Sequence, residues 1–192
     1  MIQKDIKRFE AVAIGTSAGG IEALSFLLPH IPGNTRKAFF VVQHITADSD
    51  SYYIKLLKSK CRAKVREACN TEEIVPGKIY FAPPDYHLLI EKDLTLTLSA
   101  EEKVNFSRPS IDVLFETAAE AFRNMLTGIL LTGVNRDGSA GLKRINELGG
   151  KTIVQKPEDA AFPEMPLSAL KLLKPDSIFT LEEIAGWLRN DE

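Results

Sequence analysis

The segment 11–28 constrains the fold most, because it predicts a strand, a glycine-rich turn and a helix in direct succession. Its apolar run 11–14 is short and ends at Gly15, as a buried strand does. Small residues continue to Gly20, and apolar side chains then recur with helical spacing until Pro29. A strand that turns sharply into a helix is the building unit of parallel α/β sheets, so the sequence predicts this class.

The same alternation continues along the chain. Further strands are predicted at 38–42, 79–82, 128–133 and 151–155, and helices at 51–60, 110–123, 138–148, 165–173 and 181–188. The alternating segments 87–91 and 94–98 meet across Lys92-Asp93 and predict an antiparallel hairpin. We therefore expect an α/β fold with a doubly wound, mostly parallel sheet flanked by helices, plus a hairpin excursion. Its 192 residues lack repeats and linker-like segments, so we expect one domain over 1–192.

Composition argues against several classes of protein. A net charge of −2 without any Lys/Arg-rich block argues against nucleic acid as a partner. The cysteines Cys61 and Cys69 form no Cys-x-x-Cys pair, so we expect reduced thiols and no structural metal. We find neither a signal peptide in the first residues nor an apolar run of eighteen. The expectation is a cytoplasmic protein without membrane insertion.

Polar side chains follow three of the predicted strands. Ser17 comes after the first strand, His44 ends the second, and Asp137 lies just beyond the strand at 128–133. Ligands of open α/β sheets bind at the carboxyl ends of the strands. A serine, a histidine and a carboxylate can therefore meet at one edge of this sheet, which is the set of groups that a serine hydrolase needs.

Ser17 gives the strongest single indication of catalysis. It lies within a Gly-x-Ser-x-Gly pattern between a strand and a helix, a turn that exposes the hydroxyl beside unpaired backbone N–H groups. Two alternatives remain open, a helix-capping serine and a phosphate-binding loop. The chain lacks the Gly-x-Gly-x-x-Gly pattern and the P-loop lysine, and both absences count against phosphate binding.

His44 is the best candidate for the general base, because it alone among the histidines ends a buried parallel strand next to the one that delivers Ser17. His30 lies in a loop, and His87 opens the hairpin, where it is structural or lines the cleft. Asp137 would orient the imidazole, although an Asp-Gly pair also suits a turn or a helix cap. Four other aspartates compete for this role: Asp48, Asp50, Asp85 and Asp112.

Several short motifs, in order, resemble the catalytic domain of the CheB-type chemotaxis receptor protein-glutamate methylesterases. The resemblance runs from about residue 11 to 173. The motifs are Ile14-Gly15-Thr16-Ser17-Ala18-Gly19-Gly20, Val42-Gln43-His44, 76–83, 108–115, Leu131-Thr132-Gly133, 137–142 and Met165-Pro166.

This resemblance implies an enzyme that hydrolyses glutamyl methyl esters, and also deamidates glutamine, on chemoreceptor-like proteins without a cofactor. It implies Ser17 as nucleophile, His44 as base and Asp137 as orienting acid, with backbone N–H groups of Ala18 and Val134 as the oxyanion hole. The implied partners are methylated cytoplasmic helices of a chemoreceptor, with a chemotaxis kinase or methyltransferase as further partners.

The chain departs from the family pattern in four places. Val134 replaces a common Met and Ala18 a frequent Thr, and because both keep the backbone N–H we expect function to persist. Ile45-Thr46 replaces a common Met-Pro, so the rim loop is expected to differ. Only ten residues precede the first strand, whereas the family usually has a regulatory receiver domain there. We expect either a stand-alone form or an excised domain.

Two rival functions stay open at the level of sequence. A lone domain could grip a receptor helix without turnover, although a pure binder has no need of all three catalytic groups. An esterase or deamidase acting on another protein is the second rival, because a fold does not specify its substrate. Arg108 could contact an acidic receptor surface, but an exposed arginine is more often solvated.

Overall fold

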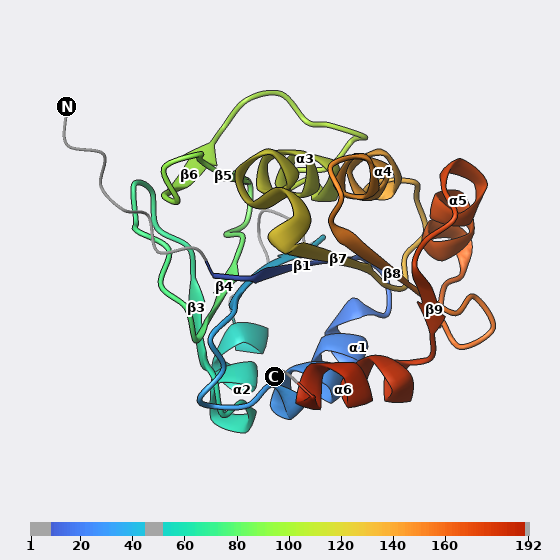
Figure 1. Ribbon diagram of the computed structural model, residues 1–192, viewed down its shortest axis with the longest axis horizontal. Coiled ribbons are helices and arrows are strands. Elements are labelled where there is room, and N and C mark those ends of the chain that lie inside the picture. Colours follow the sequence, from blue (N-terminus) through green and yellow to red (C-terminus); the bar gives the residue numbers. More distant parts are fainter. Residues whose placement is uncertain (1–8, 45–51, 191–192) are drawn as a thin grey trace.

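The computed structural model describes residues 9–44 and 52–190 as a three-layer α/β structure (Figure 1). Its central sheet has seven strands in the order β3-β4-β2-β1-β7-β8-β9, and all neighbouring pairs are parallel. The strands are β1 (Ala11–Thr16), β2 (Ala38–Gln43), β3 (Lys64–Glu67), β4 (Lys78–Phe81), β7 (Leu126–Leu130), β8 (Lys151–Gln155) and β9 (Ser177–Phe179).

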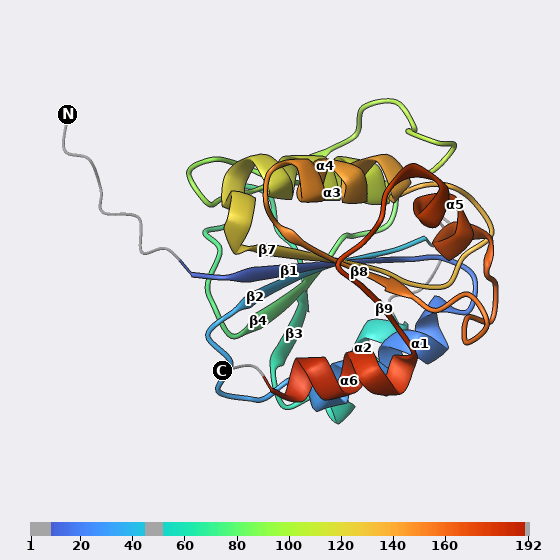
Figure 2. The same cartoon turned by 45° about the vertical axis from the view of Figure 1, so that its right-hand side comes forward.

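Helices cover both faces of this sheet (Figures 1 and 2). The upper layer holds α3 (Ile111–Phe122) and α4 (Ser139–Glu147), and the lower layer holds α1 (Gly20–Leu27), α2 (Tyr52–Lys60) and α6 (Leu181–Arg189). Helix α5 (Glu164–Leu172) lies at the end near β8 and β9. The short 3-10 turns are η1 (Leu28–His30) and η2 (Arg123–Met125). The predicted doubly wound arrangement is confirmed.

The core consists of two apolar layers, one on each side of the sheet. Successive residues of β2 alternate between them, since Phe40 packs with the layer under α3 whereas Phe39 and Val41 pack with the layer over α1. Every residue of β1, β2 and β7 is buried. Strands buried on both faces are uniformly apolar, which explains why these runs are so conspicuous in the sequence.

The predicted hairpin forms a separate two-stranded antiparallel sheet of β5 (His87–Ile90) and β6 (Leu96–Ser99). It lies beside α3, where Leu88, Ile90 and Leu96 join the upper core layer. From β6 the chain runs through 100–110 to the start of α3, the segment that closes over the site described below.

Three strand assignments differ from the sequence-based prediction. β3 and β9 were not expected, because both are short edge strands in which Val65 is the one buried residue, so their apolar signal is small. β7 ends at Leu130, earlier than expected, so Leu131-Thr132-Gly133 is already loop. This shift lengthens the segment between β7 and α4 that carries Asp137.

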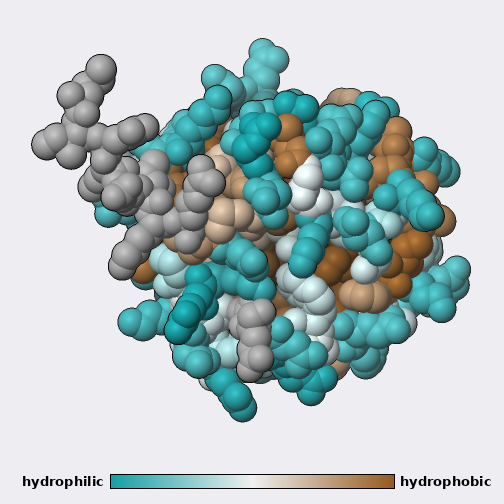
Figure 3. Space-filling model, in the orientation of Figure 1, coloured by the Kyte–Doolittle hydropathy of each residue, from teal (hydrophilic) through white to brown (hydrophobic). Residues whose placement is uncertain are grey.

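The face in Figure 3 is mainly hydrophilic, with hydrophobic residues gathered at the right-hand margin. Figure 1 places α5 and β9 there, and their exposed apolar residues include Leu167, Leu172 and Ile178. Within residues 9–44 and 52–190, no helix is both long and apolar enough to span a bilayer.

Candidate active site

The loops after β1, β2 and β7 are hydrogen-bonded to one another at the carboxyl edge of the sheet. The Ser17 N–H donates to Thr132 O at 3.0 Å, and the His44 N–H donates to Thr16 O at 3.0 Å. The side-chain amide of Gln43 adds two bonds, donating to Ser17 O at 2.8 Å and to His44 O at 2.9 Å. The backbone positions of Ser17 and His44 are thereby fixed relative to each other.

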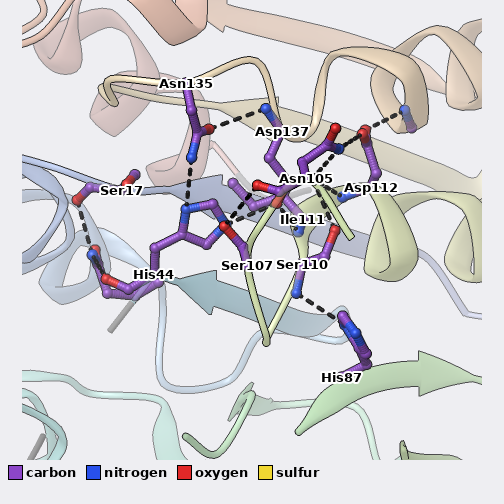
Figure 4. A network of polar contacts seen from close by, with 12 residues as sticks. Ser17, His44, His87, Asn105, Ser107, Ser110, Ile111, Asp112, Asn135 and Asp137 are labelled. Carbon is purple, nitrogen blue, oxygen red and sulfur yellow. Dashed lines mark hydrogen bonds and ion pairs between the residues drawn. The ribbon is translucent and has the colours of Figure 1, made fainter. Parts of the chain in front are cut away.

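Asp137 reaches His44 across this edge (Figure 4). The His44 Nε2 atom lies 2.8 Å from Asp137 Oδ2, although 93 residues separate the two in sequence. The Asp137 side chain is wholly buried, and the His44 side chain is 11% exposed. The carboxylate is thus shielded from solvent, whereas the imidazole remains accessible at the surface of the site.

The amino-terminus of α3 surrounds the Asp137 carboxylate with donors. Oδ2 accepts a hydrogen bond from the Ile111 N–H at 2.7 Å, while Oδ1 accepts one from the Ser110 hydroxyl at 2.8 Å and one from the Asp112 N–H at 3.2 Å. Burial by itself raises the pKa of Asp137, but the hydrogen bonds from His44 and Ile111 outweigh it and lower the pKa below its ordinary value. A helix amino-terminus favours negative charge in the same direction.

A second buried carboxyl group lies next to Asp137. Asn105 Nδ2 donates to Asp112 Oδ2 at 2.8 Å and to Asp137 Oδ1 at 3.1 Å, so one amide bridges both carboxylates. Asp112 Oδ1 also accepts the Gly141 N–H at 2.7 Å. Burial raises the pKa of Asp112 to about 6, and the neighbouring negative charge of Asp137 adds to the rise.

Asn135 contacts the other side of the imidazole. Its Oδ1 accepts the Asp137 N–H at 3.0 Å, which fixes the orientation of the amide because only an oxygen can accept that bond. Asn135 Nδ2 therefore faces His44 Nδ1, at 3.4 Å. An N–H donor against Nδ1 requires a lone pair there, so the arrangement favours the neutral imidazole with its proton on Nε2, directed at Asp137.

The Ser17 hydroxyl is the third group of the predicted triad. Figure 4 shows the His44 ring between Ser17 and Asp137. Within the described part of the chain, no hydrogen bond joins the Ser17 hydroxyl to His44. Catalytic hydrogen bonds are often long in an enzyme without substrate and tighten once substrate binds.

Two unpaired backbone N–H groups lie close to Ser17. Those of Ala18 and Val134 donate to no atom of residues 9–44 or 52–190, whereas the Gly133 N–H is used by Phe162 O at 3.0 Å. A Cβ on Gly133 would lie 3.0 Å from Ser17 Cβ, which shows how near this backbone passes to the serine. The predicted oxyanion donors are thus available on the loops that flank Ser17.

The structure brings Ser17, His44 and Asp137 to one edge, and it accounts for two of the alternative residues, His87 and Asp85. His87 is structural, since its Nδ1 accepts the Ser110 N–H at 3.1 Å and its Nε2 bonds to Glu102 O at 3.0 Å. Asp85 pairs with Arg108 at 2.8 Å. Asp48, Asp50 and the rim residues Ile45-Thr46 lie outside the described residues.

Sequence reasoning missed the residues that support Asp137, namely Asn105, Ser110 and Asn135. The sequence indicates these residues only weakly, since an isolated Asn or Ser in a loop is common, and it offered Asp112 only as an alternative to Asp137.

Among residues 9–44 and 52–190, no cluster of three or more His, Cys, Asp or Glu side chains has the arrangement of a metal site.

Comparison with known proteins gives concordant results. The profile of the family described as CheB methylesterase matches residues 12–188. A Leptospira interrogans (serovar copenhageni) protein, provisionally named a protein-glutamate methylesterase/protein-glutamine glutaminase, is 50% identical over 177 residues, which are 92% of each chain. The crystal structure of the Thermotoga maritima CheB methylesterase catalytic domain superposes with a TM-score of 0.90 at 29% identity, covering 94% of this chain and 97% of that one.

Other relatives are longer than the chain. A Cereibacter sphaeroides protein-glutamate methylesterase/protein-glutamine glutaminase is 37% identical over 176 residues, which are 90% of this chain but 48% of that protein. A Pseudomonas aeruginosa protein with the same pair of activities in its name is 37% identical over 93% of this chain and 53% of its own length. The chain thus corresponds to about half of each of these relatives.

Proposed function

Because the chain belongs to the CheB methylesterase family, we propose that it hydrolyses glutamyl methyl esters on a chemoreceptor-like protein with Ser17, His44 and Asp137 as its catalytic triad. The observation that carries the proposal is the His44–Asp137 hydrogen bond at 2.8 Å, formed where β1 delivers Ser17. A buried carboxylate holding a partly exposed imidazole beside a serine is the arrangement that activates a hydroxyl nucleophile.

In the proposed mechanism, His44 Nδ1 is the basic atom, since Nε2 is engaged by Asp137. The Ser17 oxygen attacks the ester carbonyl while its proton moves to Nδ1, which requires Asn135 Nδ2 to give up its contact at 3.4 Å. Asp137 stabilises the imidazolium that forms. The proton then passes from Nδ1 to the leaving methanol, and a glutamyl ester of Ser17 remains.

Water completes the cycle by the same route. His44 takes a proton from water, the resulting hydroxide attacks the glutamyl-serine ester, and Ser17 leaves with the proton returned by His44. During both steps the carbonyl oxygen becomes negative, and the N–H groups of Ala18 and Val134 are the proposed donors to it. Deamidation of glutamine follows the same steps, with ammonia leaving in place of methanol.

The proposed physiological substrate is a methylated cytoplasmic helix of a chemoreceptor, which would place the protein in the cytoplasm near the chemotaxis kinase and methyltransferase. We further propose that residues 1–192 act as a single catalytic domain. The support is the family assignment over residues 12–188 and the continuous apolar layers on both faces of one sheet.

A non-catalytic receptor-binding module is the second candidate. Within residues 9–44 and 52–190 no hydrogen bond joins the Ser17 hydroxyl to His44, and this favours a binder, because a binder does not need the serine activated. Covalent labelling with a fluorophosphonate separates the two: a hydrolase is labelled at Ser17, detected by mass spectrometry of the peptide that contains it, whereas a binder is not.

The decisive experiment measures methanol released from a methylated chemoreceptor fragment by the wild-type chain and by Ser17→Ala. We expect Ser17→Ala to lose at least about 10³-fold in kcat, because nothing replaces the nucleophile. Ser25→Ala, a serine of α1 that lies outside the site, is the matched control and should retain full activity. Methanol release by Ser17→Ala at the wild-type rate would reject the proposal.

A further inference from the structure

The segment between β6 and α3 ends in a tight turn whose backbone is unfavourable for its residues. Val104 and Ser107 form an isolated antiparallel bridge with reciprocal backbone hydrogen bonds of 3.2 and 2.9 Å. The two residues between them, Asn105 and Phe106, have φ angles of 49° and 62°. Positive φ at both central positions is the pattern of a type I′ turn, where Asn fits the first position and Gly is preferred at the second.

The two central residues of this turn point in opposite directions. The Asn105 amide reaches inward and bonds both Asp112 and Asp137. The Phe106 side chain is 98% exposed, the highest value among the exposed large hydrophobic residues of the described chain. One residue of the turn thus touches the proposed triad, and the next presents a whole aromatic ring to solvent.

Side-chain hydrogen bonds hold the backbone of the segment that carries this turn. Arg108 donates to Ala100 O at 2.6 Å, to Glu101 O at 2.8 Å and to Asp85 Oδ1 at 2.8 Å. His87 Nε2 bonds to Glu102 O at 3.0 Å. Arg108 therefore braces the segment that carries Phe106, a structural use that replaces the receptor contact considered from sequence.

Neither the turn nor the core explains an aromatic residue at position 106. A β-carbon is disfavoured in the left-handed region relative to glycine, and a fully exposed ring recovers none of this cost by burial. Such local cost, retained without any intramolecular benefit, is characteristic of functional positions.

Two further exposed apolar side chains lie on the Ser17 side of the site. Val134 is 54% exposed and follows Gly133, on which a Cβ would lie 3.0 Å from Ser17 Cβ. Phe162 is 41% exposed, and its carbonyl accepts the Gly133 N–H. Phe106 belongs to the Asp137 side. The triad is therefore flanked on both sides by apolar groups that the fold itself does not need.

We propose that Phe106 is a docking contact for the protein substrate, and this inference rests on the proposed function. The occupant is the polypeptide segment that carries the glutamyl ester, with an apolar side chain near the ester to meet the ring. The contacts that connect Phe106 to the proposed triad argue for this occupant. Phe106 adjoins Asn105, which bonds Asp137, and Asp137 in turn bonds His44. A polypeptide that presents its ester to Ser17 therefore lies across the edge of the site where Phe106 is exposed. Exposed aromatic residues at rigid positions are frequent hot spots of binding.

The test compares a large and a small substrate on Phe106→Ala, Phe106→Trp and wild type. With a methylated chemoreceptor fragment, we expect Phe106→Ala to lose about 5- to 30-fold in kcat/KM, mostly through KM. With p-nitrophenyl acetate, which is too small to span the rim, its kcat/KM should stay within about twofold of wild type. Phe106→Trp, which keeps a large aromatic ring, should retain most activity on the receptor fragment.

Leu56→Ala is the control, an exposed apolar residue of α2 on the opposite face of the sheet (Figure 1), and should affect neither substrate. Equal loss of Phe106→Ala on both substrates would assign a structural role and overturn the proposal, as would no loss on either. If wild type cleaves p-nitrophenyl acetate but not the methylated fragment, the proposed function fails instead. The two failures are therefore distinguishable.

Discussion

The Nε2 atom of His44 lies 2.8 Å from Oδ2 of Asp137. In the serine-protease triad the aspartate bonds Nδ1 and the serine faces Nε2, so the triad that we propose exchanges the roles of the two ring nitrogens. The exchange follows from the sides from which the two residues approach the imidazole. The amino-terminus of α3 holds Asp137 on one side of the ring, whereas Ser17 follows β1 on the other side. Nδ1 is consequently the atom available for proton transfer.

The first prediction concerns Asp137→Asn. An amide in place of the carboxylate cannot stabilise the imidazolium, so we expect kcat for the methylated fragment to fall by about 10³- to 10⁴-fold. Steady-state methanol release measures the change. Asp176→Asn is the control, since Asp176 accepts two hydrogen bonds from Thr152 far from the site and should keep near wild-type kcat. A loss below about tenfold for Asp137→Asn would contradict the triad.

The second prediction concerns Asn135→Asp, which replaces a donor beside Nδ1 by an acceptor of the same shape. Its Oδ1 can still accept the Asp137 N–H, but the new carboxylate favours a proton on Nδ1. We expect kcat to fall by about 100-fold or more, since the base is then blocked. ¹⁵N NMR of labelled histidine would show a proton on Nδ1 in addition to the one on Nε2, which Asp137 still holds.

Asn135→Ala separates this effect from simple loss of structure. It removes both contacts of the amide yet leaves the Nδ1 lone pair free, so we expect a loss of less than about tenfold in kcat. Equal losses in Asn135→Ala and Asn135→Asp, with unchanged ¹⁵N shifts, would show that Asn135 acts only through packing.

Much of the fold could be predicted because its central strands are buried on both faces. The apolar runs 11–14 and 38–42 are too short for buried helices and predict strands, and the glycine turn after the first run marks the start of its helix. The edge strands Lys64–Glu67 and Ser177–Phe179 were missed because a strand that pairs on one side only does not need a continuous run of apolar residues.

The candidate site was predictable only where a residue follows a buried strand. Ser17, His44 and Asp137 satisfy that rule, and the topology of the sheet then brings them together. Asn105 and Ser110 follow no strand of the central sheet. They reach Asp137 because the hairpin and the segment 100–110 fold back over α3, a tertiary relationship that no local pattern encodes.

The third prediction uses the raised pKa of Asp112. Burial raises this pKa from 3.8 to about 6, so the folded state binds the proton more tightly than the unfolded chain does. The contribution of Asp112 to stability is therefore fully present below about pH 4 and is lost as pH rises through about 6. At about 1.4 kcal/mol per pKa unit, the loss amounts to at most about 3 kcal/mol.

Asp112→Asn, which does not titrate, isolates this effect. Urea unfolding of both proteins between pH 4 and 7.5 should show the variant gaining stability relative to wild type as pH rises, whatever their difference at pH 4. The lowered pKa of Asp137 makes the folded protein lose stability as pH falls, at pH values more acidic than this range. Both proteins contain Asp137, so this effect does not distinguish them. Parallel stability curves would contradict the prediction.

The last prediction concerns the close approach of α1 to β2. A Cβ on Gly20 would lie 2.1 Å from Gln43 Oε1 and 2.5 Å from Thr16 Oγ1, and both of these side chains are buried. Gly20→Ala should therefore lower the free energy of unfolding by about 1–3 kcal/mol. Because Gln43 also bonds the carbonyls of Ser17 and His44, kcat should fall as well.

Gly186 in α6 provides the matched control. A Cβ there meets nothing within 4 Å, so Gly186→Ala should raise the free energy of unfolding by about 0.5–1 kcal/mol through helix propensity alone, without effect on kcat. Urea denaturation measures both variants. If Gly20→Ala proved as stable as wild type, tight packing of the Ser17 turn against Gln43 would not be what positions the serine. The alignment of Ser17 with His44 would then depend on the hydrogen bond from the Ser17 N–H to Thr132 O.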